Sequence, residues 1–275
     1  MINLVGKVGS MALLNDKRTQ IDFDKIGRIA KRLVPGVVWV SSGAVEIGRL
    51  DYISRAGHEL NGNIDEIKTD YAAQGQAILM QTYRSFIPHE HSVRQVLVEH
   101  QHFNNPAKRR QIKELFLRCP KQNAIPIVNY NDAVSFEESR KMEIATLRQK
   151  NTGNSISELV DNDETASQIA ELVETKNLLI LTNLDGIYKD INDPNSLIGT
   201  ITGATPAEVL TNIDKIKVGC TGASRAGAHG AEAKLEHIKP CIQKGIRIYI
   251  ASAKNDIRDI LNGSAPCTRI GVGIN

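Results

Sequence analysis

The 275-residue chain has no apolar run that approaches the roughly 20 residues of a membrane-spanning helix. Its net charge of +3 is too small to argue for nucleic acid or a membrane surface as a partner. The cysteines Cys119, Cys220, Cys241 and Cys267 form no CxxC pair, which favours free thiols over a disulfide framework or a zinc site. No charged segment with a cleavage site opens the chain, so we expect a mature cytoplasmic protein.

Two further absences narrow the chemistry. The GxxxxGK[ST] phosphate-binding pattern occurs nowhere. His89, His91, His100 and His102 crowd one segment, but if residues 93–100 form a strand the two pairs stand about 25 Å apart, at about 3.3 Å per residue. One zinc ion cannot bridge that distance, so no protein-built metal site is predicted.

What the sequence does contain is an alternation of short β-branched runs with amphipathic stretches, which predicts a largely parallel sheet with helices on both faces. The basic run Lys108–Arg110 falls on one predicted helix and is interpreted as its solvated face. The expected strands span 2–8, 36–42, 93–100, 124–132, 177–183 and 246–252. The expected helices span 22–34, 70–87, 107–119, 163–175, 231–245 and 255–261.

No Pro/Ser-rich linker and no internal repeat divides the chain, so a single domain over residues 1–275 is expected. The least regular part, residues 137–159, is polar and follows a predicted strand. We interpret it as an extended surface excursion with local helix or hairpin, and a disordered loop is an equal alternative.

Ligands of parallel α/β sheets bind at the carboxyl ends of the strands, so the residues that follow each strand carry the chemistry. Lys7, Gly9 and Ser10 stand at the end of the first strand. Glycine there lets the backbone approach a phosphate, and lysine can neutralise the phosphate charge. The same residues would also suit an ordinary turn. Ser42 and Gly43 follow the second strand and open a helix, which makes either an anion pocket or a simple cap.

The later strand ends are also polar. Asn129, Asn131 and Asp132 are expected to be exposed where the fourth strand stops, and turn residues would look similar. The stretch 161–163 reads Asp-Asn-Asp at the mouth of a helix, where one residue is enough for a cap. The next strand ends in a Thr-Asn pair that suits a base or ribose, although the "LDG" that follows is also good turn chemistry.

The last of these segments, "GAHGAEAKL", is expected to join a small-residue turn to a helix that carries Lys234. Together the strand ends supply two lysines, two glycine-bearing turns and a polar cluster of Ser42, Asp132 and Asn162 that can hold a zwitterion. They supply no acid/base pair and no Ser-His-Asp arrangement. That combination favours phosphoryl transfer, in which the protein positions groups and neutralises charge.

The same segments, in the same order, resemble the amino acid kinase family and, within it, the glutamate 5-kinase group. "KVGS", "SSGA", "AAQGQ", "IPIVNYNDAV", "DND", "LTNLDGIY" and "IASAKNDIRDILNG" are similar to that group's motifs over essentially the whole chain. The resemblance implies a three-layer αβα sandwich around a mainly parallel open sheet. It also implies ATP-dependent phosphorylation of the γ-carboxylate of L-glutamate, the first step towards proline.

The resemblance assigns roles to single residues. Lys7 and Lys234 would neutralise the transferring phosphoryl group, and Asp163 would orient both lysines. The implied substrate-binding residues are Ser42, Gly43, Ala44, Asp132 and Asn162. The implied ATP-binding residues are Lys7, Gly9, Ser10, Thr182, Asn183, Ala228, His229, Gly230, Ala231 and Lys234.

The resemblance also implies ATP and Mg²⁺ as cofactors, with the metal held mostly by phosphate and water, a reductase that receives the product, and a homodimer or homotetramer. No nucleic acid or membrane partner and no RNA-binding-like PUA domain are expected. Ala228 and His229 replace a threonine and a glycine of the family's phosphate segment, Asn183 replaces the usual aspartate, and the segment before Asp161 is longer than usual.

These departures leave two alternatives open. One is a kinase of the same fold that acts on another small carboxylate. The other is a non-catalytic regulator that binds a nucleotide or an amino acid. The retained lysines and the Asp-Asn-Asp stretch argue against the regulator.

Overall fold

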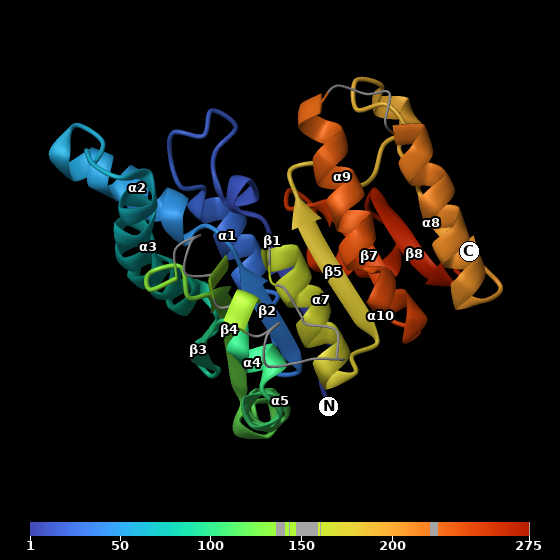
Figure 1. Cartoon of the computed structure of the whole chain (residues 1–275), viewed down its shortest axis with the longest axis horizontal. Coiled ribbons are helices and arrows are strands. Elements are labelled where there is room, and N and C mark those ends of the chain that lie inside the picture. The colour runs from blue at the N-terminus through green and yellow to red at the C-terminus, as the bar shows by residue number, and fades with distance from the viewer. Residues whose placement is uncertain (136–140, 143, 147–158, 160, 221–224, 275) are drawn as a thin grey trace.

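The computed structural model describes residues 1–135, 141–142, 144–146, 159, 161–220 and 225–274, with the backbone alone for 218–220 and 225–230. Within these residues eight strands form one sheet in the order β3-β4-β2-β1-β5-β7-β8-β6 (Figure 1). All neighbouring strands are parallel except β7 and β8. The strands are β1 (Leu4–Val8), β2 (Val37–Ser41), β3 (Ser92–Val98), β4 (Ala124–Tyr130), β5 (Asn177–Thr182), β6 (Thr200–Gly203), β7 (Arg247–Ser252) and β8 (Cys267–Val272).

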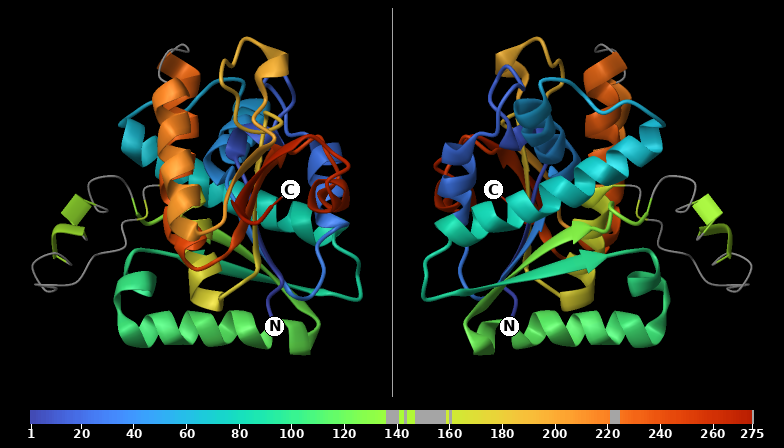
Figure 2. Two further views of the ribbon diagram at one scale, coloured as in Figure 1. Left: turned by 90° about the vertical axis from the view of Figure 1, so that its right-hand side faces the viewer. Right: turned by 90° about the vertical axis from the view of Figure 1, so that its left-hand side faces the viewer.

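Helices cover both faces of this sheet. In the side views of Figure 2 the orange helices and the blue α1 lie on opposite sides of the strands. Among the described helices, none combines the length and the apolarity that crossing a bilayer requires. The α-helices are α1 (Phe23–Ala30), α2 (Ala44–Ala56), α3 (Ile64–Phe86), α4 (Gln101–Asn104), α5 (Pro106–Arg118), α7 (Asn162–Val173), α8 (Pro206–Cys220), α9 (Arg225–His237), α10 (Lys239–Gln243) and α11 (Ile257–Asn262). The 3₁₀ helices are η1 (Ser10–Leu13), η2 (Pro120–Gln122) and η3 (Pro194–Ser196).

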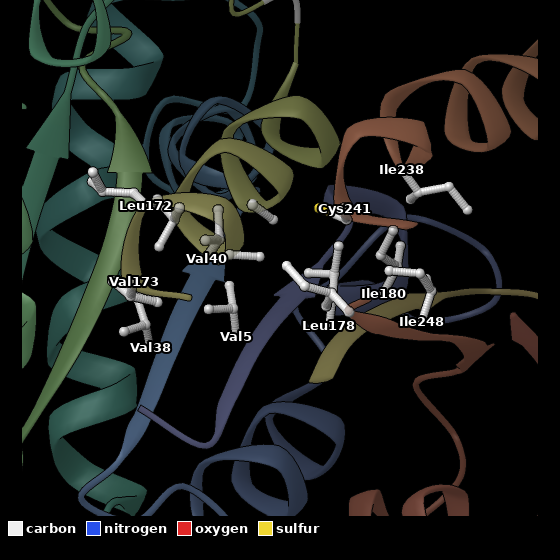
Figure 3. Close-up of a cluster of buried hydrophobic side chains, with 14 of the residues drawn as sticks. Val5, Val38, Val40, Leu172, Val173, Leu178, Ile180, Ile238, Cys241 and Ile248 are labelled. Carbon is white, nitrogen blue, oxygen red and sulfur yellow. The ribbon is translucent and has the colours of Figure 1, made fainter. Parts of the chain in front are cut away.

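The central strands are buried on both faces, and their side chains alternate between two cores. In β5, Leu178 and Ile180 enter the core under α7 and α10, whereas Leu179 and Leu181 enter the core under α1, α3 and α11. Figure 3 shows the first of these cores, where valines of β1 and β2 meet Leu172 and Val173 of α7. The apolar runs of the central strands are therefore continuous, because each of these strands faces two helical layers.

Two glycines set the contact between α2 and α3. A Cβ on Gly75 would stand 1.8 Å from the carbonyl oxygen of Ala44, and a Cβ on Gly48 would stand 1.9 Å from that of Tyr71. Only glycine permits so close an approach of two helix backbones. The contact places Gln76, the residue after Gly75, beside the carboxyl end of β4, where its side chain meets that of Asn129.

The predicted fold class is confirmed, and all six predicted strands are present. The prediction missed β6, a short edge strand, and β8, which lies between β6 and β7. The helix predicted over 231–245 is wrong in its bounds. It begins earlier, at Arg225, and is broken after His237, because Pro240 has no backbone N–H to continue α9 and lies instead in the first turn of α10. Residues 141–142 and 144–146 of the expected surface excursion are helical, and most of its remainder lies outside the described residues.

Candidate active site

Two lysines meet one carboxylate at the carboxyl end of the sheet. Asp163 lies in the first turn of α7, and its two oxygens lie 2.5 Å from Lys7 Nζ and 2.8 Å from Lys234 Nζ. Lys7 comes from β1 and Lys234 from α9, so three elements distant in the sequence supply the cluster. Lys7 is 6% exposed and Asp163 1% exposed, while the Lys234 side chain is 23% exposed. The cluster is buried on one side and open to solvent through Lys234.

The charges of this cluster depend on one another. Burial by itself raises the pKa of Asp163, but the positive charges of Lys7 and Lys234 and their hydrogen bonds hold that pKa below its ordinary value. Asp163 is therefore an anion at neutral pH. It holds two ammonium groups near each other that would otherwise repel.

The three residues of the Asp-Asn-Asp stretch make different contacts. Asp161 is the N-cap of α7, and its Oδ1 accepts hydrogen bonds from the backbone N–H groups of Asp163 at 2.7 Å and Glu164 at 3.0 Å. Asn162 points towards β2 and β4, and Asp163 points towards the lysines. The expectation that a single residue caps the helix is confirmed, and that residue is Asp161. The side chains of Asn162 and Asp163 make other contacts.

A chain of amide groups connects the ends of β2 and β4 to α7. Asn162 Nδ2 donates to Ser42 Oγ and to Asn129 Oδ1, each at 3.0 Å. Asn129 Nδ2 donates to Gln76 Oε1 at 2.9 Å. The expectation that Asn129 is exposed is wrong: it is 1% exposed, because its side chain turns back to form these bonds.

The orientation of these amides follows from one backbone group. The N–H of Tyr130 can only donate, and it donates to Asn129 Oδ1 at 2.9 Å. Asn129 Oδ1 is thus the acceptor for Asn162, and Asn162 must offer its nitrogen. Asn162 Oδ1 is left buried without a hydrogen-bond partner among the described residues. A buried acceptor without a donor is costly, so this oxygen suits an N–H group of a ligand.

The other side of the lysine cluster is formed by β5 and η1. Thr182 is the last residue of β5, and Asn183 follows it. The Thr182 hydroxyl forms a local turn, because it donates to the carbonyl of Leu184 and accepts from its N–H, both at 2.9 Å. Gly9 donates its N–H to the carbonyl of Leu181 at 3.1 Å, which fixes the start of η1 beside β5.

The predicted turn before Lys234 is wrong. The backbone of Ala228, His229, Gly230 and Ala231 is helical, since α9 begins at Arg225. The small residues in the first turns of this helix were interpreted as a turn because Gly227 and Gly230 are loop signals in a sequence. The side chain of His229, for which a phosphate contact was predicted, lies outside those that the structure describes.

Most of the predicted site residues line one cavity of about 400 Å³. Neighbouring parallel strands bring their ends together in the order β4, β2, β1 and β5, so the lysine cluster lies between the amide chain and Thr182. Gly43 and Ala44 are not among the lining residues. Gly43 turns into α2 at a φ of 108°, and Ala44 is buried against α3. The predicted residues that line the cavity are Lys7, Gly9, Ser10, Ser42, Asp132, Asn162, Asp163, Thr182, Asn183 and Lys234.

Several residues of the site had no predicted role. Gln76 and Asn129 support Asn162, and Tyr130 lines the cavity while its hydroxyl lies 2.7 Å from Nδ1 of the buried His100. Gln76 and Asn129 stand in the motifs "AAQGQ" and "NYND", which were visible in the sequence. Their pairing was not visible, because 53 residues separate them along the chain.

This fold and this cavity agree with the family comparison. The model of the amino acid kinase family matches residues 4–252, and the chain belongs to that family. Membership places it among phosphotransferases that act on small molecules.

The chain is similar to named members of the family. It is 27% identical to glutamate 5-kinase 1 of Bacillus licheniformis, over 98% of this chain and 68% of that protein. It is 29% identical to glutamate 5-kinase of Clostridium perfringens, over 94% of this chain and 91% of that protein. Among solved structures, carbamate kinase of Giardia lamblia bound to citric acid shares the fold, with a TM-score of 0.55, 16% identity and 98% coverage of both chains.

Proposed function

We propose that the protein transfers the γ-phosphate of ATP to the γ-carboxylate of L-glutamate and so forms γ-glutamyl phosphate. The observation that carries the proposal is the Lys7–Asp163–Lys234 cluster between two different halves of one cavity. On one side stand hydroxyl, amide and carboxylate groups suited to an amino acid. On the other stand Thr182, Asn183 and the turn at Gly9, which suit a nucleotide.

In this mechanism the amino acid is held by its polar ends. Its ammonium group would donate to the unpartnered Asn162 Oδ1 and approach Asp132, which lines the same cavity. The γ-carboxylate, with an ordinary pKa near 4.3, is already ionised at neutral pH and needs no general base. It attacks the γ-phosphorus in line, and the bond from that phosphorus to the bridging oxygen of ADP breaks.

The lysines act on the charge that spreads over the transferring group. Lys7 and Lys234 would neutralise the equatorial oxygens, and Asp163 holds both ammonium groups at fixed positions before substrate arrives. Preorganised charges of this kind need no rearrangement at the moment of reaction.

The carboxylates of the cavity fit a nucleotide-borne Mg²⁺ better than a protein-built metal centre. Both oxygens of Asp163 are paired with lysines, and Asp161 caps α7. No group of three or more metal-binding side chains occurs in the described ranges. Mg²⁺ would thus be held chiefly by phosphate oxygens and water, where it neutralises phosphate charge.

The proposal includes the cellular setting that this reaction implies. An acyl phosphate is unstable in water, so a reductase would consume it, as the first step towards proline requires. A homo-oligomer in the cytoplasm is the setting we propose.

The test is ATP turnover on a panel of acids, with hydroxylamine to trap the acyl phosphate as a hydroxamate. L-Glutamate should react best among glutamate, aspartate, 2-aminoadipate and N-acetylglutamate. Lys234→Ala should lose at least a hundredfold in kcat, and Lys121→Ala, which changes an exposed lysine away from the cavity, should not.

The other outcomes separate the alternatives. Better turnover of another acid would replace glutamate and retain the kinase. No turnover of any acid with retained nucleotide binding would favour the regulator, for which the "GAHG" segment is the supporting observation.

A further inference from the structure

A second cavity lies at the amino ends of the strands, at the opposite end of the sheet from the lysine cluster. Its volume is about 780 Å³, and its lining includes Thr175 and Ile246, which stand just before β5 and β7. These are the amino ends of strands whose carboxyl ends face the candidate active site. Helix α5, at the lower end of the sheet in Figure 1, forms one wall.

Four cations and two carboxylates line this second cavity. Lys113 pairs with Glu174 at 2.7 Å, and Lys244 pairs with Glu171 at 3.0 Å. Both carboxylates are thereby neutralised by lysines. The two remaining cations are arginines of α5.

Arg109 and Arg110 have no ion-pair partner in the part of the chain that the structure describes. Both are exposed in the first turns of α5 and line the cavity. Lys108, the third member of the basic run, bonds to Gln101 and is not among the lining residues. The predicted solvated face is thus confirmed for Arg109 and Arg110, and these two residues also line the cavity.

We propose that this second cavity binds a small anion with two or more phosphate or carboxylate groups. The guanidinium group offers several N–H donors in a planar fork that matches such oxygens in pairs. Two uncompensated arginines match a dianion, and the volume falls within the range of about 300–1,000 Å³ that small-ligand sites occupy. The lysine pairs hold the walls on either side of the site, since each joins α7 or its C-cap to a neighbouring helix.

This site is separate from the proposed kinase reaction. It shares no lining residue with the candidate active site. The two are joined by α7, which carries Asp163 in its first turn and Glu171 in its last. A helix of 12 residues spans about 18 Å, so an anion in this cavity would not touch the reacting groups.

The test is isothermal titration with inorganic pyrophosphate and, in a second arm, tricarballylate, at low ionic strength. Arg109→Gln/Arg110→Gln should weaken binding at least tenfold. Arg118→Gln/Lys121→Gln removes the same charge from exposed positions outside the cavity and should change the Kd less than twofold. Comparing the two arms shows whether phosphate or carboxylate is preferred.

Lys234→Ala separates the two cavities, because pyrophosphate also suits the candidate active site. Binding that depends on Arg109 and Arg110 should persist in this variant. Equal binding by the Arg109→Gln/Arg110→Gln protein and the unaltered protein would overturn the proposal. Loss of all binding in Lys234→Ala would also overturn it. Thermal denaturation of each variant verifies that it is folded.

Discussion

At the scale of single residues, Asp163 determines whether the cleft can hold two positive charges. Each oxygen of this carboxylate faces one ammonium group, and the carboxylate is almost fully buried. A buried charge is stable only when it is paired, and removing one partner leaves the others uncompensated. The cluster is thus a unit whose three members support one another.

We expect Asp163→Asn to lower the free energy of unfolding by about 3–5 kcal/mol at pH 7, because it leaves Lys7 buried without its carboxylate. The folded-state pKa of Asp163 lies below its unfolded value. Its contribution is therefore complete above an unfolded pKa of about 3.9 and is lost as the pH falls through the folded value. Denaturant unfolding from pH 7 to pH 3 should show the difference between the two proteins begin to shrink below about pH 4.

The control for this change is Asp70→Asn, which alters an exposed carboxylate whose side chain forms no ion pair or hydrogen bond among the described residues. It should shift the free energy of unfolding by less than about 0.5 kcal/mol. A constant difference between Asp163→Asn and the unaltered protein over the whole pH range would contradict the ion-pair account.

Gln76 is a positioning residue rather than one that touches substrate. It accepts from Asn129, which in turn accepts from Asn162. We expect Gln76→Leu to raise KM for the amino acid about tenfold, because the Asn162 amide loses its fixed orientation. KM for ATP should change less than twofold, since the nucleotide half of the cavity is unaltered.

The matched control is Gln81→Leu, the same substitution at an exposed position of α3. Steady-state kinetics with each substrate varied in turn measures both constants. Equal increases in both KM values, or no change in either, would show that Gln76 does not position the Asn162 amide for the amino acid.

At the scale of elements, the packing of α2 on α3 depends on glycine. The nearest neighbours of a Cβ on Gly75 would be backbone atoms, the carbonyl oxygen of Ala44 at 1.8 Å and the nitrogen of Gly48 at 2.4 Å. Backbone cannot rotate away as a side chain can. The two helices would have to separate.

We expect Gly75→Ala to cost about 3 kcal/mol of stability or more, which is the upper end of overpacking effects. Gly199→Ala is the control, because a Cβ there meets nothing within 4 Å. Denaturant unfolding measures both variants. A Gly75→Ala protein as stable as Gly199→Ala would show that the helices do not approach as closely as described.

At the scale of the whole molecule, cysteines lie in both cores of the sheet. Cys241 belongs to the core under α7 and α10, and Cys267 belongs to the opposite core. Burial raises the pKa of Cys241 to about 12 and also raises the pKa values of Cys119 and Cys267. Only the thiolate reacts with alkylating reagents. These cysteines are therefore protected in two ways, because the core excludes the reagent and the raised pKa keeps the thiol protonated.

We expect iodoacetamide at pH 8 to label these three cysteines in the folded protein at least a thousandfold more slowly than a free thiol. In denaturant all three should react at the ordinary rate. Peptide mapping by mass spectrometry assigns the label to each residue. Rapid labelling of Cys241 in the folded protein would mean that its core opens easily.

The sequence predicted some strands and helices correctly and missed others. Val37–Ser41 and Asn177–Thr182 were recognisable as strands because β-branched and apolar runs are strong local signals. Cys267–Val272 was not, since its mixed composition gives no continuous apolar run. The first turns of α9 were missed because their glycines and alanines give no helical hydrophobic pattern.

The sequence by itself determined the alternation of strands and helices and the chemical groups at the strand ends, because both depend on local composition and order. Lys7, Ser42, Asp132, Asp163 and Lys234 could all be selected in this way. Only the tertiary structure decided which groups pair. The strand order brings the ends of β4, β2, β1 and β5 together, and hydrogen bonds across as many as 120 residues then orient Asn162. Pairing depends on distances of a few ångströms, which no local pattern encodes.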